Sequence, residues 1–127
     1  MRIIGHGIDM VDIARIQSRL GSPEGTWAER VYSPDEREQA DPPPRHARYF
    51  AGRFAGKEAV AKALGTGFSG EVTWREIELL RSPSGAPQVR LTGGALEAAA
   101  DLGVTGWLIS ISYCGGLAMA SAIAIGD

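Results

Sequence analysis

The sequence predicts an α+β fold in which a largely antiparallel sheet packs with one long central helix. Two observations lead to this prediction. An Ala-rich helical pattern runs from about Arg45 to Leu64, and the β-favouring runs that follow it are joined by short turns within 77–91 and again within 107–125. Because hairpins supply most of the strand connections, the pattern disfavours a doubly wound nucleotide-binding fold.

Length and composition describe one globular domain, residues 1–127. The chain is 44% hydrophobic and 22% charged with a net charge of −2, so it lacks the basic excess that would indicate nucleic-acid binding. The single cysteine, Cys114, excludes an internal disulfide and suits a reducing compartment. No signal-peptide pattern and no apolar run of membrane-spanning length is present, so we expect a cytoplasmic protein that does not bind membranes.

Residues 3–13 are rich in isoleucine, valine and methionine and predict a strand, in which Asp9 is the conspicuous acid. A carboxylate in an apolar strand needs an ionic partner, hydrogen bonds or a metal ion, because isolated burial is costly or forces protonation. The segment 12–20 has the apolar spacing of a helix, with Arg15 and Arg19 on its outward face. These arginines fit either a solvated surface or a docking stripe for an acidic partner.

The segment 33–36 reads Ser-Pro-Asp-Glu, a capping box that begins a helix to about Ala40 and needs no other explanation. Prolines at 42–44 end that helix, and the central helix follows with Gly52 and Gly56 inside it. Each interior glycine costs roughly 0.5–1 kcal/mol relative to alanine. Close approach of a ligand or of another packed element would explain them equally well.

A glycine-containing loop, 65–70, follows the central helix and could aim backbone N–H groups at an anion. Strands at 77–80 and 88–91 form a hairpin, and Thr92 is placed to cap a helix over 94–102.

Two last strands, 107–113 and 117–125, complete the chain. Ser110 and Ser112 alternate with isoleucines, so the two serines share one face of the sheet. Plain sheet alternation is the simplest explanation of that spacing.

Charged side chains within the central helix form the main functional signal. Glu58 and Lys62 lie about 40° apart on a strip that is otherwise alanine, which presents a carboxylate and an amine over small side chains. Together with Asp9, Arg45 and Arg53, they are the parts needed to hold a hard cation and a diphosphate. The residues alone indicate Mg²⁺-dependent chemistry on a phosphate ester, with a solvated helix face as the alternative.

Two motifs carry a resemblance to a known family. Gly-His-Gly-Ile-Asp at 5–9 is followed by Arg-Phe-Ala-Gly-Lys-Glu-Ala-Val-Ala-Lys at 53–62. Further matches are Arg45, Gly-Thr-Gly at 65–67, Trp74 through Glu78, Gly85 with Pro87, and Ser110-Ile111-Ser112. Over nearly its whole length the chain resembles the holo-[acyl-carrier-protein] synthases of the 4′-phosphopantetheinyl transferase superfamily.

The resemblance implies that family's fold and its activity. The 4′-phosphopantetheine arm of coenzyme A would be transferred to a serine of an apo acyl carrier protein, of fatty acid or polyketide type, with release of adenosine 3′,5′-bisphosphate. Asp9 and Glu58 would hold Mg²⁺, Glu58 would be the base that deprotonates the serine, and Lys62 would neutralise or protonate the leaving phosphate.

The resemblance also implies partners and further contacts. Arg15, with help from Arg19, would meet the acidic helix of the carrier protein. The family is typically a homotrimer with active sites between subunits, although no apolar stripe in this sequence identifies the subunit contact. The expected coenzyme A contacts are Arg45, Arg53, Lys62, Gly65, Thr66, Ser84, Gly85, Pro87, Ser110 and Ser112.

Three features depart from the family pattern. Tyr113 stands where a histidine is usual, Cys-Gly-Gly at 114–116 follows where polar residues are common, and Ala86 replaces the lysine of Gly-Lys-Pro. The predicted metal pair and Lys62 are unchanged, so we expect retained activity with altered coenzyme A affinity. The alternatives are a non-catalytic relative that binds coenzyme A or a carrier protein, and a Mg²⁺-dependent hydrolase of coenzyme A. The sequence assigns no role to Lys57.

Overall fold

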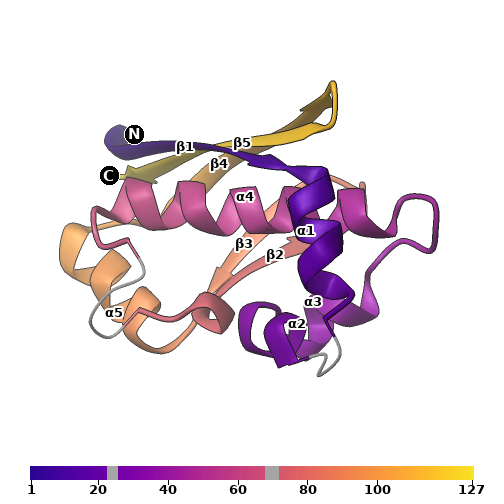
Figure 1. The fold of residues 1–127 in the computed structure, drawn as a ribbon. Helices are drawn as coiled ribbons and strands as arrows, with labels where there is room; N and C mark the ends of the chain where they lie inside the picture. The colour runs from indigo at the N-terminus through magenta and orange to yellow at the C-terminus, as the bar shows by residue number, and fades with distance from the viewer. Residues whose placement is uncertain (23–25, 68–71) are drawn as a thin grey trace.

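The computed structural model describes residues 1–22, 26–67 and 72–127 (Figure 1). The strands are β1 (Arg2–Asp12), β2 (Ile77–Arg81), β3 (Pro87–Leu91), β4 (Gly106–Cys114) and β5 (Leu117–Gly126). The helices are α1 (Ile13–Leu20), α2 (Thr26–Val31), α3 (Pro34–Glu38), α4 (His46–Leu64) and α5 (Gly93–Leu102), with a 3₁₀ turn, η1, at Trp74–Glu76.

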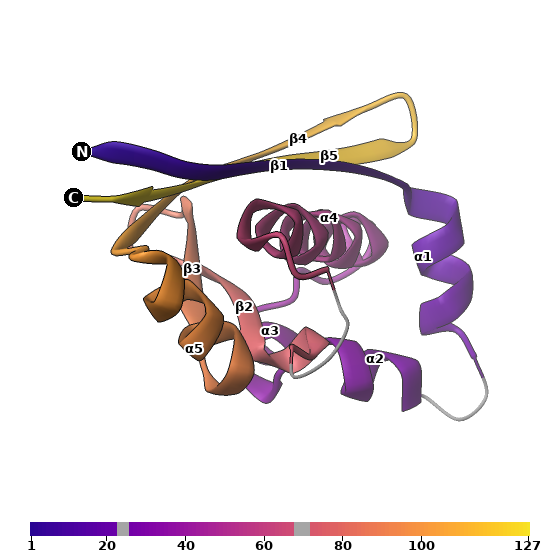
Figure 2. The ribbon, with the colours of Figure 1, turned by 90° about the vertical axis from the view of Figure 1, so that its left-hand side faces the viewer.

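The long helix α4 lies between two antiparallel β-layers (Figure 2). A three-stranded sheet of order β1-β5-β4 covers one side, and the β2–β3 hairpin lies on the other. Ala55 and Ala59 of α4 share a fully buried cluster with Ala120 and Ala122 of β5 and with Leu79 of β2. The predicted α+β fold, organised around a central helix, is therefore confirmed.

Strand β1 approaches α4 closely because two of its residues have no side chain. A Cβ atom at Gly7 would overlap the backbone carbonyl oxygen of Ala59, and one at Gly5 would overlap that of Ala63. Asp9 follows Gly7 by two positions, so its side chain points to the same face of the sheet, toward α4. It pairs in register with Ala120 of β5. The strand acid is thus set against the second half of α4.

Interior glycines of α4 serve packing between parts of the chain. A Cβ atom at Gly56 would lie 2.9 Å from Cγ of Leu79, and one at Gly52 would overlap the hydroxyl of Tyr113. Of the two explanations that the sequence left open, close packing therefore accounts for both glycines. None of the helices in the described segments is long and apolar enough to cross a membrane.

The sequence analysis missed one helix, and one predicted helix cap needs correction. Helix α2 was not expected from the sequence, and Thr92 occupies the N-cap position of α5 without a side-chain hydrogen bond. The cap is supplied from elsewhere in the chain, because the N–H of Gly94 donates to Oε2 of Glu76 at 3.0 Å.

The outer sheet face, which points away from α4, carries several large apolar side chains together with serines. Alternate residues of β1, β4 and β5 point there, because their neighbours face α4. Its large side chains, which are between 39% and 65% exposed, are Ile3, Ile8, Met10, Leu108, Leu117 and Met119. A patch of this kind is typical of a protein–protein contact. It could not be seen as a stripe in the sequence because separate strands contribute to it.

The predicted capping box at the start of α3 is present but is only part of the role of Glu36. The N–H of Ser33 donates to Oε1 of Glu36 at 2.9 Å, and the Ser33 hydroxyl accepts from the Glu36 N–H at 3.2 Å. Glu36 is fully buried, and its Oε2 accepts from the N–H of Leu79 in β2 at 2.9 Å. The expectation that capping alone explains Glu36 is therefore wrong.

Lys57 is the buried partner of that carboxylate. Its Nζ lies 2.6 Å from Oε1 of Glu36, and both side chains are fully buried. The same ammonium donates to the backbone carbonyls of Trp74, at 3.0 Å, and Ile77. Burial lowers the pKa of Lys57, while the Glu36 carboxylate opposes that shift. The ion pair joins α3, α4, η1 and β2 at one point.

We expect Lys57→Met to lower the free energy of unfolding by about 3–5 kcal/mol, because it leaves a buried carboxylate without its counter-ion. Urea unfolding followed by circular dichroism measures this change. Adding Glu36→Gln to Lys57→Met should recover part of the loss, since the uncompensated charge is then removed. Arg75→Met, at an exposed cation of η1, is the control. A loss no greater than that of the control would show that the pair does not stabilise the fold.

Candidate active site

Two cavities lie on opposite sides of α4. At 100° per residue, the nine-residue step from Arg53 to Lys62 places these side chains about 180° apart around the helix. The Asp9–Glu58 pocket, about 780 Å³, is lined by Asp9, Met10, Val11, Arg15, Ile16, Arg19, Trp27, Arg30, Val31, Phe54, Glu58, Lys62 and Trp74. The arginine pocket, about 260 Å³, is lined by Asp41, Arg45, Arg48, Tyr49, Arg53, Arg81, Gly85, Pro87, Ile111 and Tyr113.

The predicted strand acid and helix lysine meet in the first of these cavities. Nζ of Lys62 lies 3.1 Å from Oδ1 of Asp9 and donates to the carbonyl oxygen of Ile8 at 2.9 Å. The Asp9 side chain is 17% exposed and that of Lys62 51% exposed. The ammonium can therefore follow a ligand into the cavity, whereas the carboxylate is fixed by the strand.

Glu58 lines the same cavity one helical turn before Lys62. Burial raises the pKa of the Glu58 carboxyl, the nearby Asp9 carboxylate raises it further, and Lys62 partly opposes the shift. Two carboxylates close enough to affect each other form a pair that a cation would stabilise. The described residues contain no cluster of three or more acidic, histidine or cysteine ligands. A two-carboxylate oxygen site fits Mg²⁺, which usually keeps waters and substrate phosphates as its other ligands.

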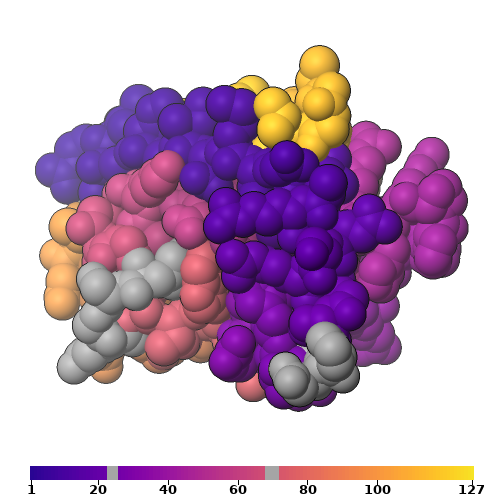
Figure 3. All heavy atoms as spheres, viewed as in Figure 1, coloured from indigo at the N-terminus to yellow at the C-terminus, as the bar shows by residue number. Residues whose placement is uncertain are grey.

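Aromatic side chains form a wall beside this carboxylate pair. The ring of Phe54 stacks on Trp74 at 4.9 Å and on Trp27 at 5.9 Å between centroids. Figure 3 shows this face of the molecule, where α1 and α2 lie beside the last turns of α4. Both predicted docking arginines, Arg15 and Arg19, are exposed there. The cavity thus combines an acidic floor, an apolar wall and a cationic rim.

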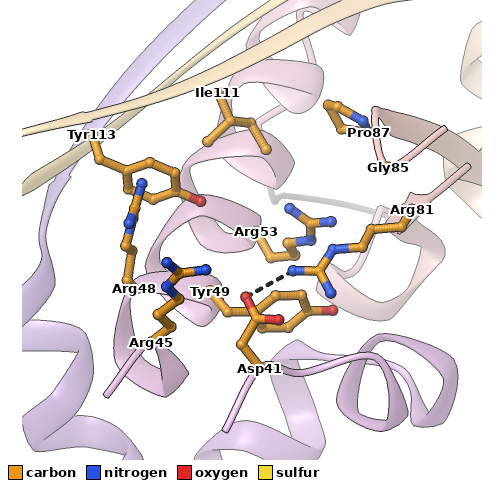
Figure 4. A pocket seen from close by; sticks show the side chains of 10 residues that line it. All are labelled: Asp41, Arg45, Arg48, Tyr49, Arg53, Arg81, Gly85, Pro87, Ile111 and Tyr113. Atoms are coloured by element: carbon orange, nitrogen blue, oxygen red, sulfur yellow. Dashed lines mark hydrogen bonds and ion pairs between the residues drawn. The ribbon is translucent and has the colours of Figure 1, made fainter. Parts of the chain in front are cut away.

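The arginine pocket holds its cations over aromatic rings (Figure 4). Two guanidiniums lie near the ring of Tyr49, with Cζ of Arg53 at 4.7 Å and Cζ of Arg81 at 5.2 Å from its centroid. The Tyr49 hydroxyl donates to the carbonyl oxygen of Glu36 at 2.6 Å, which fixes the ring. Arg81 pairs with Asp41 at 2.8 Å, and hydrogen bonding to that guanidinium lowers the pKa of the Asp41 carboxyl.

Arg53 is the central cation of this pocket and is unsatisfied. It is 5% exposed, and its Nε and Nη2 atoms have no hydrogen-bond partner among the described residues. A buried guanidinium whose donors are unpaired is costly unless an anion accepts from them. The pocket is therefore suited to a phosphate group.

The predicted coenzyme A contacts divide between several places. Arg45, Arg53, Gly85 and Pro87 line the arginine pocket, whereas Lys62 lies in the Asp9–Glu58 pocket. Ser84 is exposed in the β2–β3 turn, where its hydroxyl lies 2.8 Å from that of Ser82.

The described part of the glycine loop caps α4. The N–H groups of Thr66 and Gly67 both donate to the carbonyl oxygen of Ala61, and that of Gly65 donates to Lys62. Gly65 is left-handed, with φ of 76°, which suits a glycine at the helix end. These N–H groups are therefore occupied by the helix, and residues 68–70 of the predicted loop lie outside the described residues.

The serines of β4 lie apart from both cavities. Ser110 and Ser112 are exposed on the outer sheet face, where Ser110 pairs in register with Ser121 of β5. Their neighbours Ile111 and Tyr113 point toward α4 and line the arginine pocket. Within one chain, the predicted serines and the arginines are on opposite faces of the sheet.

Several lining residues were missed by the sequence interpretation. Arg48 and Tyr49 lie three and four positions after Arg45, with Gly52 seven positions after it, so helical spacing could have placed all of them on one face. The contribution of Arg81 depends on how β2 packs, for which the sequence holds no signal.

Comparisons with known proteins identify the family of this chain. The sequence model of the 4′-phosphopantetheinyl transferase superfamily matches residues 5–119. A holo-[acyl-carrier-protein] synthase of Desulforudis audaxviator is 46% identical over 126 residues, covering 98% of this chain and 94% of the relative.

Solved structures extend the comparison to the fold. The holo-[acyl-carrier-protein] synthase of Helicobacter pylori in complex with coenzyme A has a TM-score of 0.83 at 32% identity, covering 94% of this chain and 99% of that one. The structure of a Bacillus anthracis holo-(acyl-carrier-protein) synthase in complex with CoA (3′,5′-ADP) has a TM-score of 0.81 at 30% identity, covering 98% of each chain. The chain belongs to the 4′-phosphopantetheinyl transferase superfamily.

Proposed function

We propose that this protein transfers the 4′-phosphopantetheine arm of coenzyme A to a serine of an apo acyl carrier protein. The observation that carries the proposal is the grouping of Asp9, Glu58 and Lys62 around an open cavity. The curated relatives named holo-[acyl-carrier-protein] synthase and the neighbours solved with coenzyme A support it.

The metal ion is part of this proposal. Asp9 and Glu58 would hold Mg²⁺, and an ion there would bind the diphosphate oxygens of coenzyme A and neutralise their charge. The Asp9 carboxylate raises the pKa of Glu58, and this repulsion between the two carboxylates supports a cation at this position.

The residues of the chain then have defined roles in the transfer. Glu58, directly or through a water molecule, accepts the proton of the attacking serine hydroxyl, which would otherwise be a poor nucleophile. The serine oxygen bonds to the phosphorus that carries the pantetheine arm. The bond from that phosphorus to the bridging oxygen breaks, and adenosine 3′,5′-bisphosphate leaves with the oxygen. Lys62, whose side chain is half exposed, stabilises the charge that develops on the leaving phosphate.

The 3′-phosphate of coenzyme A is assigned to the arginine pocket. If the diphosphate lies at the carboxylate pair, the 3′-phosphate is the remaining anion, and unpaired Arg53 with Arg45 would receive it. Since the two cavities share no lining residue and flank α4, we assign them to two copies of the chain that share one substrate.

A homotrimer explains how the two cavities could meet. The two edge strands of the sheet border the two cavities, because Met10 of β1 lines the Asp9–Glu58 pocket and Tyr113 of β4 lines the arginine pocket. Contact between the β4 edge of one copy and the β1 edge of the next is heterologous, and such contacts close into a trimeric ring when each copy is rotated by 120° from the last. Exposed Ser110 and Ser112 would then lie at the shared boundary.

The carrier protein is assigned to the rim of the Asp9–Glu58 pocket. Arg15, Arg19 and also Arg30 present positive charge there, and the ring of Trp27 lies 5.8 Å from Cζ of Arg19. A negatively charged helix beside the acceptor serine fits this surface, and the aromatic wall offers a contact for its apolar side chains.

We expect Glu58→Gln to lower kcat for transfer by about 10²–10⁴-fold, because the base and a metal ligand are lost together. Mass spectrometry of the apo carrier protein, incubated with coenzyme A and Mg²⁺, measures the gain of the phosphopantetheine arm, and EDTA should abolish it. Glu97→Gln, at an exposed residue of α5, is the control. If wild-type protein binds coenzyme A but modifies none of several carrier proteins, the proposal is wrong. Release of the bisphosphate without an acceptor would instead indicate a hydrolase.

We expect inactive copies to complement each other if the site is shared. Mixed trimers of Glu58→Gln and Arg53→Met chains should recover roughly a third of wild-type activity, since one of the three interfaces in each mixed trimer joins both intact halves. Co-expression with two affinity tags and tandem purification provides the mixture. Glu58→Gln mixed with Asp9→Asn is the matched control, because both defects lie in the same half of the site. No recovery in the first mixture would place the whole site within one chain.

We expect the double change Arg15→Glu and Arg19→Glu to raise KM for the carrier protein about tenfold or more, with little effect on KM for coenzyme A. Added salt should weaken wild-type carrier binding in the same way, since exposed charges are screened. Steady-state kinetics with each substrate varied separately tests this. Arg2→Glu, at the far end of β1, is the control. An unchanged KM for the carrier would place docking elsewhere.

A further inference from the structure

Arg48 and Tyr113 form a pair in the arginine pocket to which the family resemblance assigns no role. Cζ of Arg48 lies 4.2 Å from the centroid of the Tyr113 ring, so the guanidinium is stacked on the ring face (Figure 4). Arg48 is exposed and makes no ion pair with the described residues, although Asp41 lines the same cavity. A guanidinium held this way keeps its hydrogen-bond donors available.

The position of the Tyr113 ring is fixed by α4. Its hydroxyl lies so close to the backbone of Gly52 that a Cβ atom there would overlap it, and that Cβ would also lie 3.1 Å from Cγ2 of Ile111. Gly52 directly precedes Arg53 in the helix. The ring is therefore held against α4, and it holds Arg48 at the lining of the cavity that also contains Arg53.

Two basic residues of the family pattern are absent from this pocket, and Arg48 offsets the loss of positive charge. A histidine and a lysine that the family pattern places at this pocket are Tyr113 and Ala86 here, and neither carries a positive charge near neutral pH. Arg48 returns a permanent cation to the same cavity. Because stacking limits its rotamers before the ligand arrives, less side-chain entropy is lost on binding.

We propose that Arg48, positioned by the face of the Tyr113 ring, binds the 3′-phosphate of coenzyme A and gives this protein its preference for coenzyme A over 3′-dephospho-coenzyme A. Arg48 is the binding residue and Tyr113 the positioning residue. This inference rests on the proposed function.

Steady-state kinetics with the two donors tests Arg48. Arg48→Ala should raise KM for coenzyme A about tenfold with kcat within about twofold, because a charge-assisted hydrogen bond to the donor is lost equally in ground and transition states. KM for 3′-dephospho-coenzyme A should not change. Arg75→Ala is the charge-matched control outside the pocket. An unchanged KM for coenzyme A, or the same increase for both donors, would overturn the inference.

Two changes at Tyr113 separate the ring face from the hydroxyl. Tyr113→Phe keeps the stacking surface and should retain the preference, whereas Tyr113→Leu should lose about as much as Arg48→Ala. Combining Tyr113→Leu with Arg48→Ala should add little further loss, since both changes remove one interaction. If Tyr113→Phe loses as much as Tyr113→Leu, the hydroxyl is the active group and the positioning role is wrong.

Calorimetric titration separates this inference from the proposed function. Wild-type protein should bind coenzyme A more tightly than 3′-dephospho-coenzyme A, and Arg48→Ala should reduce that difference about tenfold whether or not any carrier protein is modified, while Arg45 and Arg53 retain the remainder. Absence of transfer together with an intact binding preference would reject the proposed function alone. Equal binding of both donors by wild-type protein would reject the role of Arg48.

Discussion

The close approach of β1 to α4 is the constraint on which the candidate site depends. Gly5 and Gly7 allow the strand backbone to lie against the carbonyl oxygens of Ala59 and Ala63. This close packing of strand and helix lets Asp9 reach the strip of α4 that carries Glu58 and Lys62. Oδ1 of Asp9 lies 3.1 Å from Nζ of Lys62. The glycines at 5 and 7 are therefore requirements of packing, and the acidic cavity follows from them.

The buried pair of Lys57 and Glu36 performs a similar function on the other side of α4. It ties the helix to β2 and to η1, and the same segment brings Trp74 against Phe54 in the aromatic wall. Adjacent residues of α4 thus have different roles. Lys57 points into the protein and fixes the helix, whereas Glu58 points into the cavity and is available for chemistry.

Local sequence rules predicted what depends on neighbours along the chain. The 3.6-residue period placed Glu58 and Lys62 on one strip, and the capping box at Ser33 was present as expected. The same rules could not show that Glu36 also pairs with Lys57, because that contact depends on tertiary packing. For Ser110 and Ser112, a period of two showed that they share a face, but only the packing of α4 decides which face is outward. The residues alone suggested Asp9 and Glu58 as parts of one cation site, and the family resemblance assigned both as metal ligands, but neither showed how the strand reaches the helix.

The separation of the two cavities has an electrostatic reason. If Arg53 lay beside Glu58 or Asp9 in one chain, the charges would pair, and both the cation site and the phosphate site would be lost. With the arginines on the opposite side of α4, Asp9 pairs with Lys62 and not with an arginine, the pKa of Glu58 stays raised, and two guanidinium nitrogens of Arg53 stay unpartnered. In the proposed assembly, coenzyme A lies between the two sets, with its diphosphate on the 5′ oxygen of the ribose and its third phosphate on the 3′ oxygen. Its own negative charge then separates the arginines of one copy from the carboxylates of the next, so that binding satisfies charges that neither copy can satisfy alone.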